Sequence, residues 1–408
     1  MDKMNSNTNL ISKKLKLIKP SPTLAVTAKA KALKAEGKDV IGLGAGEPDF
    51  DTPENIKQAA YAAIKSGKTK YTPVDGVPEL KESIINKFQK ENKLNYNIEN
   101  ITVGCGAKHV IYNIIAATIN PDDEVIIPTP YWVSYPDMVL INGGIPVIAK
   151  TTKSENFKLT PEVLIKHITS KTKLLVLNSP SNPTGSCYSE NELEALVEVL
   201  NDHPNIYIIS DDIYEHIRYQ NNQYVNIANI SDSIKDRTFV VNGVSKAYSM
   251  TGWRIGYAAG DKDVIKAVSK IQSQSTSNPC SISQYASIEA LSENSYEFIE
   301  KNKLIFKERR DLVIEELSKI AGIQTEVPDG AFYIFPSCEN LIGKKTPAGM
   351  KIENCTDFAQ YLLEEVLVAV VPGIAFGAEN FFRISYATSN QNLIEACSRI
   401  KQACEKLV

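Results

Sequence analysis

Short apolar runs rich in β-branched residues alternate with longer helical patterns through the middle of the chain, and this alternation constrains the fold more than any other feature. Each run ends in a polar or proline-containing turn, as expected of central strands that are covered on both faces. We therefore predict an α/β fold with a mostly parallel, doubly wound sheet. The runs expected to be strands are residues 124–127, 145–149, 173–177, 206–209, 238–241 and 255–258.

The pattern changes after about residue 292, where long amphipathic helices begin. We expect a helix over residues 296–317, and then a second, smaller α+β domain. Its short strands are expected near residues 330–335, 368–371 and 382–385. The predicted division is an N-terminal segment that joins the small domain (1–52), a large domain (53–294) and the small domain itself (295–408).

Composition excludes several classes of protein. A formal net charge of -3 over 408 residues argues against a whole-protein electrostatic role on nucleic acid or on anionic lipid. The 7 cysteines never form a Cys-x-x-Cys pair, and the 4 histidines include no close pair. Neither a disulfide framework nor a zinc site is therefore expected, and we predict no metal.

The amino terminus has lysines but no apolar segment behind them. Residues 1–9 are polar, so we expect a loose tail there and not a signal peptide. No apolar stretch of the sequence is long enough to cross a bilayer. A cytoplasmic protein is the expectation.

The segment SKAYSMTGWR at 245–254 carries the strongest local signal for chemistry. Lys246 comes close behind a predicted buried strand, where loss of hydration lowers the pKa of an ammonium group. A lysine in that state is nucleophilic, forms an imine with an aldehyde cofactor and can act as a general base. Arg254 supplies a fixed cation for a phosphate, and Ser245 supplies a hydroxyl donor. The alternative is an ordinary surface lysine and arginine.

Two further turns lie where the carboxyl ends of parallel strands would place a ligand. Asp211 follows the predicted strand at 206–209, and Tyr214 comes three positions later. A carboxylate there pairs with a protonated ring nitrogen, or else caps a helix. The loop VGCGAKH at 103–109 places small residues before a helical pattern, which favours an anion site, although many such loops are purely structural.

Together these segments resemble the class I, fold-type I pyridoxal-phosphate aminotransferases, and the aspartate aminotransferases of bacteria in particular. The resemblance runs from about Leu15 to the carboxyl terminus. It implies a seven-stranded large-domain sheet and pyridoxal 5′-phosphate as cofactor. The motifs that carry it are GAGEPDF (44–50), Tyr71, PYW (130–132), NPTG (182–185), DDIY (211–214), SKAYSMTGWR (245–254) and FRISY (382–386).

The resemblance assigns the cofactor contacts. Lys246 becomes the Schiff-base lysine, Asp211 pairs with the pyridinium nitrogen, and Trp132 stacks on the ring. A protonated ring is an electron sink, which is why the acidic partner matters. Tyr214 and Asn182 are expected at the ring hydroxyl. The residues expected around the phosphate are Gly106, Ala107, Lys108, Ser245, Arg254 and, from a second subunit, Tyr71. That last contribution implies a homodimer with shared active sites.

The resemblance also assigns the substrate contacts. Arg383 is expected to clamp the α-carboxylate, with the Gly46 backbone beside it and with Trp132 and Asn182 also at the substrate. Cis peptide bonds are expected before Pro130 and Pro183. No nucleic acid and no membrane is expected as a partner, only amino-acid and 2-oxo-acid substrates.

The residues that bind the distal carboxylate of the substrate are harder to assign from the resemblance. Ser273 stands where animal aspartate aminotransferases place an arginine from the neighbouring subunit. In the bacterial branch Lys108 serves the distal carboxylate and Lys19 is linked to prephenate, although both also read as solvated surface lysines. The resemblance thus implies transamination from aspartate to 2-oxoglutarate, giving oxaloacetate and glutamate, with conversion of prephenate to arogenate as a second activity.

Two alternatives stay open at this point. An aminotransferase for aromatic amino acids, alanine or kynurenine would share every cofactor residue and differ only in the distal pocket. A cofactor-sensing transcription regulator would carry a winged-helix domain before the aminotransferase domain, and fewer than about fifty residues precede the first motif, so we expect an enzyme.

Overall fold

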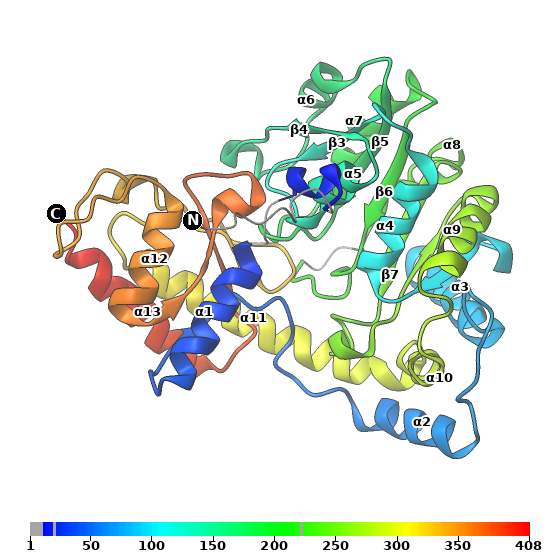
Figure 1. Cartoon of the computed structure of the whole chain (residues 1–408), viewed down its shortest axis with the longest axis horizontal. Coiled ribbons are helices and arrows are strands. Elements are labelled where there is room, and N and C mark those ends of the chain that lie inside the picture. The colour runs from blue at the N-terminus through cyan, green and yellow to red at the C-terminus, as the bar shows by residue number, and fades with distance from the viewer. Residues whose placement is uncertain (1–10, 19–21, 221–222) are drawn as a thin grey trace, which may run out of the picture.

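A computed structural model of the chain describes residues 11–18, 22–220 and 223–408 (Figure 1). The tail expected at residues 1–9 and the candidate Lys19 lie outside the described residues. Among the helices that the structure describes, none combines the length and the apolar character needed to span a membrane.

Within the described residues, a large sheet contains seven strands in the order β2-β8-β7-β6-β5-β3-β4. Strand β8 runs antiparallel to both of its neighbours, and the other pairs are parallel. The mostly parallel sheet predicted from the sequence is therefore confirmed. The strands are β2 (Ile101–Gly104), β3 (Glu124–Pro128), β4 (Ile145–Ala149), β5 (Thr172–Asn178), β6 (Tyr207–Asp211), β7 (Thr238–Gly243) and β8 (Gly256–Ala259).

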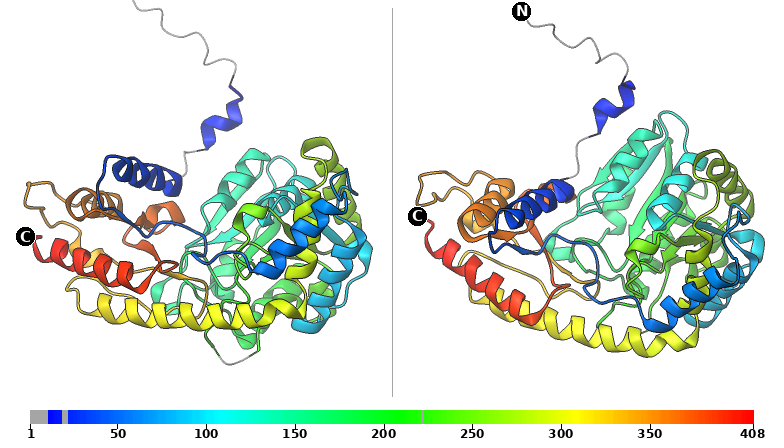
Figure 2. Two further views of the ribbon diagram at one scale, coloured as in Figure 1. Left: turned by 90° about the horizontal axis from the view of Figure 1, so that it is seen from below. Right: turned by 60° about the horizontal axis from the view of Figure 1, so that its bottom comes forward.

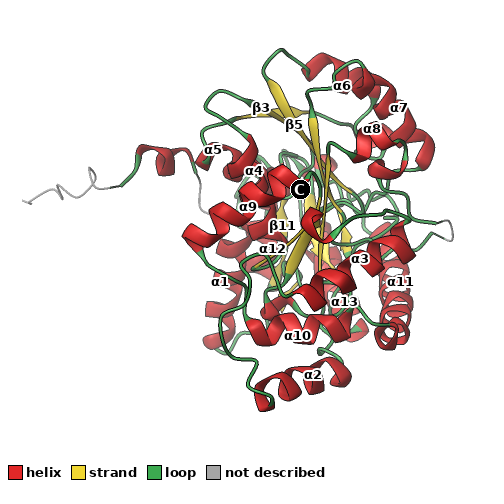
Figure 3. Cartoon of the chain, turned by 90° about the vertical axis from the view of Figure 1, so that its right-hand side faces the viewer, coloured by secondary structure: helices red, strands yellow, loops and turns green. Residues whose placement is uncertain are grey.

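Helices cover both faces of this sheet because its strands are apolar on both sides (Figure 3). In β3, Val125 and Ile127 pack against one layer of helices, while Ile126 packs against the other. One layer contains α4 (Ala107–Thr118), α5 (Ser134–Ile141) and α9 (Lys262–Ser275), and the other contains α6 (Pro161–His167) and α7 (Glu190–Asn201). A capping box between Ser189 and Glu192 starts α7.

A third group of helices packs on the part of the sheet formed by β2 and β8. These helices are α2 (Glu54–Lys65), α3 (Pro78–Asn92) and α10 (Ser281–Ala290), and α8 (Asp232–Lys235) is a single short turn before β7. The 3-10 helices are η2 (Lys13–Leu17), η3 (Ile98–Asn100), η4 (Lys153–Glu155), η5 (Ile227–Asn229), η6 (Thr251–Trp253), η7 (Glu293–Ser295), η8 (Glu339–Leu341) and η9 (Gly373–Phe376).

The carboxyl-terminal part of the chain forms a second, smaller unit. Its three-stranded antiparallel sheet contains β9 (Tyr333–Ile334), β12 (Phe382–Ser385) and β11 (Val371–Pro372). Helices α11 (Tyr296–Ser318), α12 (Cys355–Val366) and α13 (Asn390–Glu405) pack around an apolar core that includes this sheet. Helix α11 runs along the small unit and the large one (Figures 1 and 2).

The N-terminal segment reaches the small unit through a short parallel pair of strands. Strand β1 (Ile41–Gly42) pairs with β10 (Val368–Ala369). Helix α1 (Pro22–Ala35) lies beside them, and Ala30 packs with Val40 and Ala369 in one small core. These contacts agree with the predicted division of the chain, whose boundaries stay a prediction.

Candidate active site

A cavity of about 340 Å³ lies where the carboxyl ends of the parallel strands approach the small unit. Asn178 ends β5 and Asp211 ends β6, and both line the cavity together with Arg383 of β12. The two units therefore build one site. The predicted site residues that line it are Gly46, Ala107, Lys108, Trp132, Asn182, Asp211, Tyr214, Ser245, Lys246, Arg254 and Arg383.

Lys246 lies in the turn after β7, and its Nζ donates a hydrogen bond to the Gly46 carbonyl at 2.5 Å. The side chain is half-buried because it faces the cavity. Burial lowers the pKa of its ammonium to about 8; Glu47 opposes this shift, and the cations Arg383 and Arg254 add to it. A lysine in this state reaches its nucleophilic neutral form near neutral pH.

Asp211 is buried at the floor of the same cavity. Its Oδ2 accepts a hydrogen bond from the Tyr135 hydroxyl at 2.6 Å, and its Oδ1 accepts the Ile213 backbone N–H at 3.3 Å. Burial raises the pKa of this carboxyl group to about 6, although the two hydrogen bonds favour the ionised form. Tyr214 lines the cavity too, with its hydroxyl 2.9 Å from that of Tyr333.

The start of α4 forms a cradle for an anion. Gly106 has φ +88°, and a Cβ there would come within 2.2 Å of Arg254 Nη2. That guanidinium donates to the carbonyls of Thr251 at 2.9 Å and Cys105 at 3.3 Å, which holds it beside the helix end. The first N–H groups of α4 have no partner inside the helix, and Ser245 adds a hydroxyl to the cavity wall. This donor set fits the phosphate group of pyridoxal phosphate.

Arg383 is the second buried cation of the cavity and is only 2% exposed. It donates from Nη1 to Asn182 Oδ1 at 2.9 Å and from Nη2 to the Gly44 carbonyl at 2.8 Å. Its guanidinium also lies 4.4 Å from the centre of the Tyr333 ring. Among the described residues, its Nε has no hydrogen-bond partner. A buried guanidinium with an unused donor suits a carboxylate ligand.

Lys108 and Trp132 lie together in the wall of the cavity. The Lys108 ammonium is 4.8 Å from the centre of the Trp132 ring, within range of a cation–π contact. Lys108 is exposed, yet surrounding protein shields its ammonium from water, and this burial together with the nearby Arg254 lowers its pKa. It is therefore a cation at the cavity that forms no ion pair with a carboxylate of the described part of the chain.

Gly106, Tyr71 and Ser273 do not line this cavity, although Gly106 lies against Arg254 in the cradle at the start of α4. Tyr71 is 92% exposed, and Ser273 lies on the exposed face of α9, where its hydroxyl donates to the Lys270 carbonyl. Lys19 lies outside the described residues. Tyr71 was expected to act across a subunit interface, so a single chain leaves that prediction untested. Ser273 was expected only to leave the distal carboxylate without an arginine.

The predicted cis peptide bonds are present before Pro130 and before Pro183. The bond before Pro180 is cis as well, which the sequence did not indicate. These prolines lie in the turns after β3 and β5, next to Trp132 and Asn182.

The cavity residues that were not identified from the sequence include Asn178, Tyr135, Tyr333 and Phe376. Asn178 directly follows a predicted strand, so its position was a usable signal. The local sequence around each of the three aromatic residues indicates only a buried position, in a helix, a strand and a loop respectively. Only the packing of distant elements places them at the cavity.

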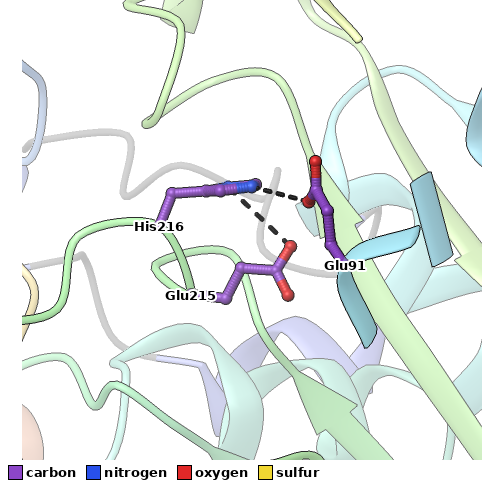
Figure 4. A group of neighbouring side chains, drawn as sticks. All are labelled: Glu91, Glu215 and His216. Carbon is purple, nitrogen blue, oxygen red and sulfur yellow. Dashed lines mark hydrogen bonds and ion pairs between the residues drawn. The ribbon is translucent and has the colours of Figure 1, made fainter. Parts of the chain in front are cut away.

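A second polar cluster lies away from this cavity, and it brings together Glu91, Glu215 and His216 (Figure 4). Their ligand atoms lie within 4.8 Å of one another, a spacing that could suit a metal ion. However, the buried Lys87 ammonium pairs with Glu215 and lies 3.5 Å from Glu91. Since Lys87 already pairs with both carboxylates, we assign a structural role to this cluster.

The chain matches the family described as "Aminotransferase class I and II" over residues 38–400. Curated relatives align along nearly the whole chain. A probable aspartate/prephenate aminotransferase of Rickettsia bellii is 56% identical and covers 98% of this chain and 100% of its own. The aspartate/prephenate aminotransferase of Cereibacter sphaeroides is 55% identical, with 97% and 99% covered.

Solved structures agree in fold as well as in sequence. The crystal structure of the aspartate aminotransferase from Rhizobium meliloti superimposes with a TM-score of 0.95 at 52% identity, and covers 98% of this chain and 99% of its own. The aspartate aminotransferase from Thermus thermophilus with maleate gives a TM-score of 0.90 at 43% identity, with 96% and 99% covered. With a cavity that fits the cofactor of such enzymes and with relatives of this similarity, the chain belongs to the class I and II aminotransferase family.

Proposed function

We propose that this protein is a cytoplasmic, pyridoxal 5′-phosphate-dependent aminotransferase that moves the amino group of aspartate to 2-oxoglutarate. The observation that carries the proposal is the convergence of the Lys246 ammonium, the Asp211 carboxylate and the Arg383 guanidinium on one cavity. A lysine, an acid and a fixed cation in this arrangement match the needs of amino-group transfer at an amino acid.

The cofactor-binding residues form three groups around the cavity. Lys246 binds the aldehyde carbon, while Asp211 faces the ring nitrogen and Tyr214 and Asn182 the ring hydroxyl. At the N-terminus of α4, beside Gly106, the backbone N–H groups of Ala107 and Lys108 bind the phosphate together with Ser245 and Arg254. Trp132 supplies a flat apolar surface for the ring. When bound, the cofactor supplies an electron sink for the charge left on the substrate when Cα is deprotonated.

Lys246 has a second role as the base that removes the proton from the substrate Cα. Its lowered pKa, about 8, means that the neutral amine is accessible near neutral pH, as a general base requires. Arg383 orients the substrate by binding its α-carboxylate, beside the backbone of Gly46. This contact holds the substrate in one orientation, in which Cα lies within reach of Lys246.

The distal carboxylate of the substrate is assigned to Lys108. Its ammonium lies at the cavity wall on Trp132 and pairs with no carboxylate there among the described residues. The names of the relatives support a dicarboxylic substrate, since several are aspartate or aspartate/prephenate aminotransferases and one was solved with maleate, a dicarboxylate. Prephenate also carries two carboxylates, and we propose it as a second amino acceptor, with Lys19 contributing to its use.

The active form is proposed to be a homodimer with shared sites. Tyr71 is 92% exposed on the single chain, an unusual position for a tyrosine that the sequence places at the cofactor phosphate. Tyr61 and Ile64 on the nearby helix α2 are also exposed, at 61% and 51%. An apolar surface at this end of the molecule suits contact with a second copy, whose site Tyr71 would then complete.

The experiment that tests the proposal follows the visible spectrum of the loaded protein as single amino acids are added. Aspartate and glutamate should convert the pyridoxal form of the cofactor into the pyridoxamine form. Prephenate should then restore the pyridoxal form, and phenylpyruvate, which lacks the second carboxylate, should do so much less. If only aromatic amino acids or alanine react, the aspartate assignment is wrong; if no amino acid reacts, aminotransfer itself is wrong.

A further inference from the structure

The shortest hydrogen bond to the Asp211 carboxylate comes from a residue that no assignment above includes. The Tyr135 hydroxyl donates to Asp211 Oδ2 at 2.6 Å, whereas the Ile213 N–H reaches Oδ1 only at 3.3 Å. Tyr135 is 1% exposed and Asp211 is 4% exposed, so this contact is shielded from solvent. A charge-assisted hydrogen bond of this length, out of water, is a strong one.

Packing holds Tyr135 in place for this contact. The residue lies in the first turn of α5, within the core that α4 and α5 form against the sheet. Its ring meets the Trp132 ring edge to face, with the centroids 5.2 Å apart at 81°. Burial raises the pKa of the Tyr135 hydroxyl, as do the nearby Asp211 charge and hydrogen bond. The phenol therefore stays protonated and can only donate to Asp211.

The Tyr135 hydroxyl affects the ionisation of the Asp211 carboxyl group. Burial alone favours the neutral form of Asp211, and the Tyr135 hydrogen bond favours the ionised form. The other ionisable groups that face Asp211 are Lys246, whose charge also favours ionisation, and Tyr214. Lys246 is the reactive lysine of the proposed function, so its free ammonium is consumed when it binds the aldehyde. Tyr135 is then the side-chain donor that remains on Asp211, beside the longer contact from the Ile213 backbone N–H.

We propose that Tyr135 is a positioning residue that keeps Asp211 ionised and oriented toward the ring nitrogen of the cofactor. This inference rests on the proposed function, because it needs a ring nitrogen in the cavity. Without the hydroxyl, Asp211 competes better for the proton that it shares with that nitrogen, and the proton moves from the ring to the carboxylate. Tyr135 thus acts through Asp211 and is assigned no contact with the substrate or the cofactor.

The test compares wild-type protein with Tyr135→Phe, both loaded with pyridoxal phosphate that carries ¹⁵N in the ring. Phenylalanine keeps the volume and the contact with Trp132 and removes only the donor. We expect the ¹⁵N resonance to move toward the value of neutral pyridine, and kcat to fall about tenfold to hundredfold, as for a lost hydrogen bond to a charged group. Tyr361→Phe, which removes a buried tyrosine hydroxyl that donates to the Ala403 carbonyl, should change neither quantity.

The Asp211→Asn background separates a role through Asp211 from simple packing. There Tyr135→Phe should change kcat less than about twofold, because the group through which Tyr135 acts is gone. Should Tyr135→Phe alone fail to fold, the double variant should recover the fold, since no buried carboxylate then lacks its donor. An unchanged ¹⁵N shift, an equal effect in both backgrounds, or a double variant that also fails to fold overturns the inference. Aminotransfer by the wild-type protein would stand in each case, so the two proposals fail separately.

Discussion

Arg383 donates a hydrogen bond to the side chain of Asn182 across 201 positions of sequence, at 2.9 Å. The contact joins β12 of the small unit to the turn after β5 of the large sheet. Arg383 also donates to the Gly44 carbonyl at 2.8 Å, so the N-terminal segment is tied to the same guanidinium. One buried cation therefore links the three parts of the chain at the place where a substrate carboxylate is proposed to bind.

Arg383→Lys should weaken substrate binding without removing the cofactor. Lysine keeps the charge but loses the planar set of donors that binds a carboxylate through two hydrogen bonds. We expect kcat/KM for aspartate to fall about thirty- to 160-fold, which corresponds to a loss of roughly 2–3 kcal/mol of binding free energy, mainly through KM. Steady-state kinetics measures this. The visible absorption of the bound pyridoxal phosphate should be unchanged, and a normal KM would contradict the assignment.

Lys246→Ala should abolish covalent attachment of the cofactor. The variant retains the phosphate cradle, so it should still bind pyridoxal phosphate, but gel filtration under denaturing conditions should separate the two. Turnover should fall by at least about a thousandfold, because both nucleophile and base are lost. Lys166→Ala, at an exposed position on α6, serves as the matched control. Full turnover of Lys246→Ala would remove the basis of the proposed mechanism.

Lys108→Ala should act on dicarboxylic substrates only. The variant removes the cation assigned to the distal carboxylate, at a cost of roughly 2 kcal/mol or more for a desolvated pair. The ratio of kcat/KM for aspartate to that for alanine is the quantity to measure, and we expect it to drop about thirtyfold. An equal loss with both amino acids would place Lys108 at the phosphate and leave the distal carboxylate unassigned.

Asp211→Asn should stabilise the cofactor-free protein while weakening cofactor binding. Burial raises the pKa of Asp211 to about 6 from the ordinary 3.8, so between these values the folded protein holds a proton that the unfolded chain has released. Stability from this group is therefore lost as pH rises through that window, by up to about 3 kcal/mol. Thermal unfolding should show Tm of the variant above wild type at about pH 7.5 and close to it at about pH 4.5.

The cofactor should reduce the stability advantage of Asp211→Asn over the wild-type protein. Pyridoxal phosphate should raise Tm of the wild-type protein more than that of Asp211→Asn, because a ligand stabilises the fold in proportion to its affinity. A variant that gains as much from the cofactor as the wild type does would argue against a contact between Asp211 and the ring nitrogen.

Lys87→Met should be strongly destabilising although it lies outside the cavity. It leaves Glu215 buried without the Lys87 ammonium, while Asn92 and Asn242 still donate to this carboxylate at 2.7 Å each. Breaking a buried pair in this way costs about 3–5 kcal/mol. Lys90→Met on the same helix removes an exposed pair with Glu293 and should cost under about 1 kcal/mol. Chemical denaturation of both variants measures the difference.

The predicted strands show how far local pattern reaches. The run at 145–149 is a strand with the same bounds in the structure, and the run at 382–385 likewise. Strand β2 (Ile101–Gly104) was not predicted, because four residues that lead into a glycine-containing loop carry no distinct period. Its strand conformation depends on pairing with β8, where Thr102 lies opposite Ala258. Long-range pairing of this kind leaves no local signature.

The sequence by itself determined the α/β class, the family and the side chains that carry the chemistry. Lys246, Asp211 and Arg383 each lie in or just after a strand, and a local motif identifies each of them. Only the tertiary structure decided which groups meet and in what state of charge. The Tyr135–Asp211 and Arg383–Asn182 contacts join distant segments. The lowered pKa of Lys246 was expected from the strand before it, but the raised pKa of Asp211 was not, because packing in three dimensions decides how much water each group loses.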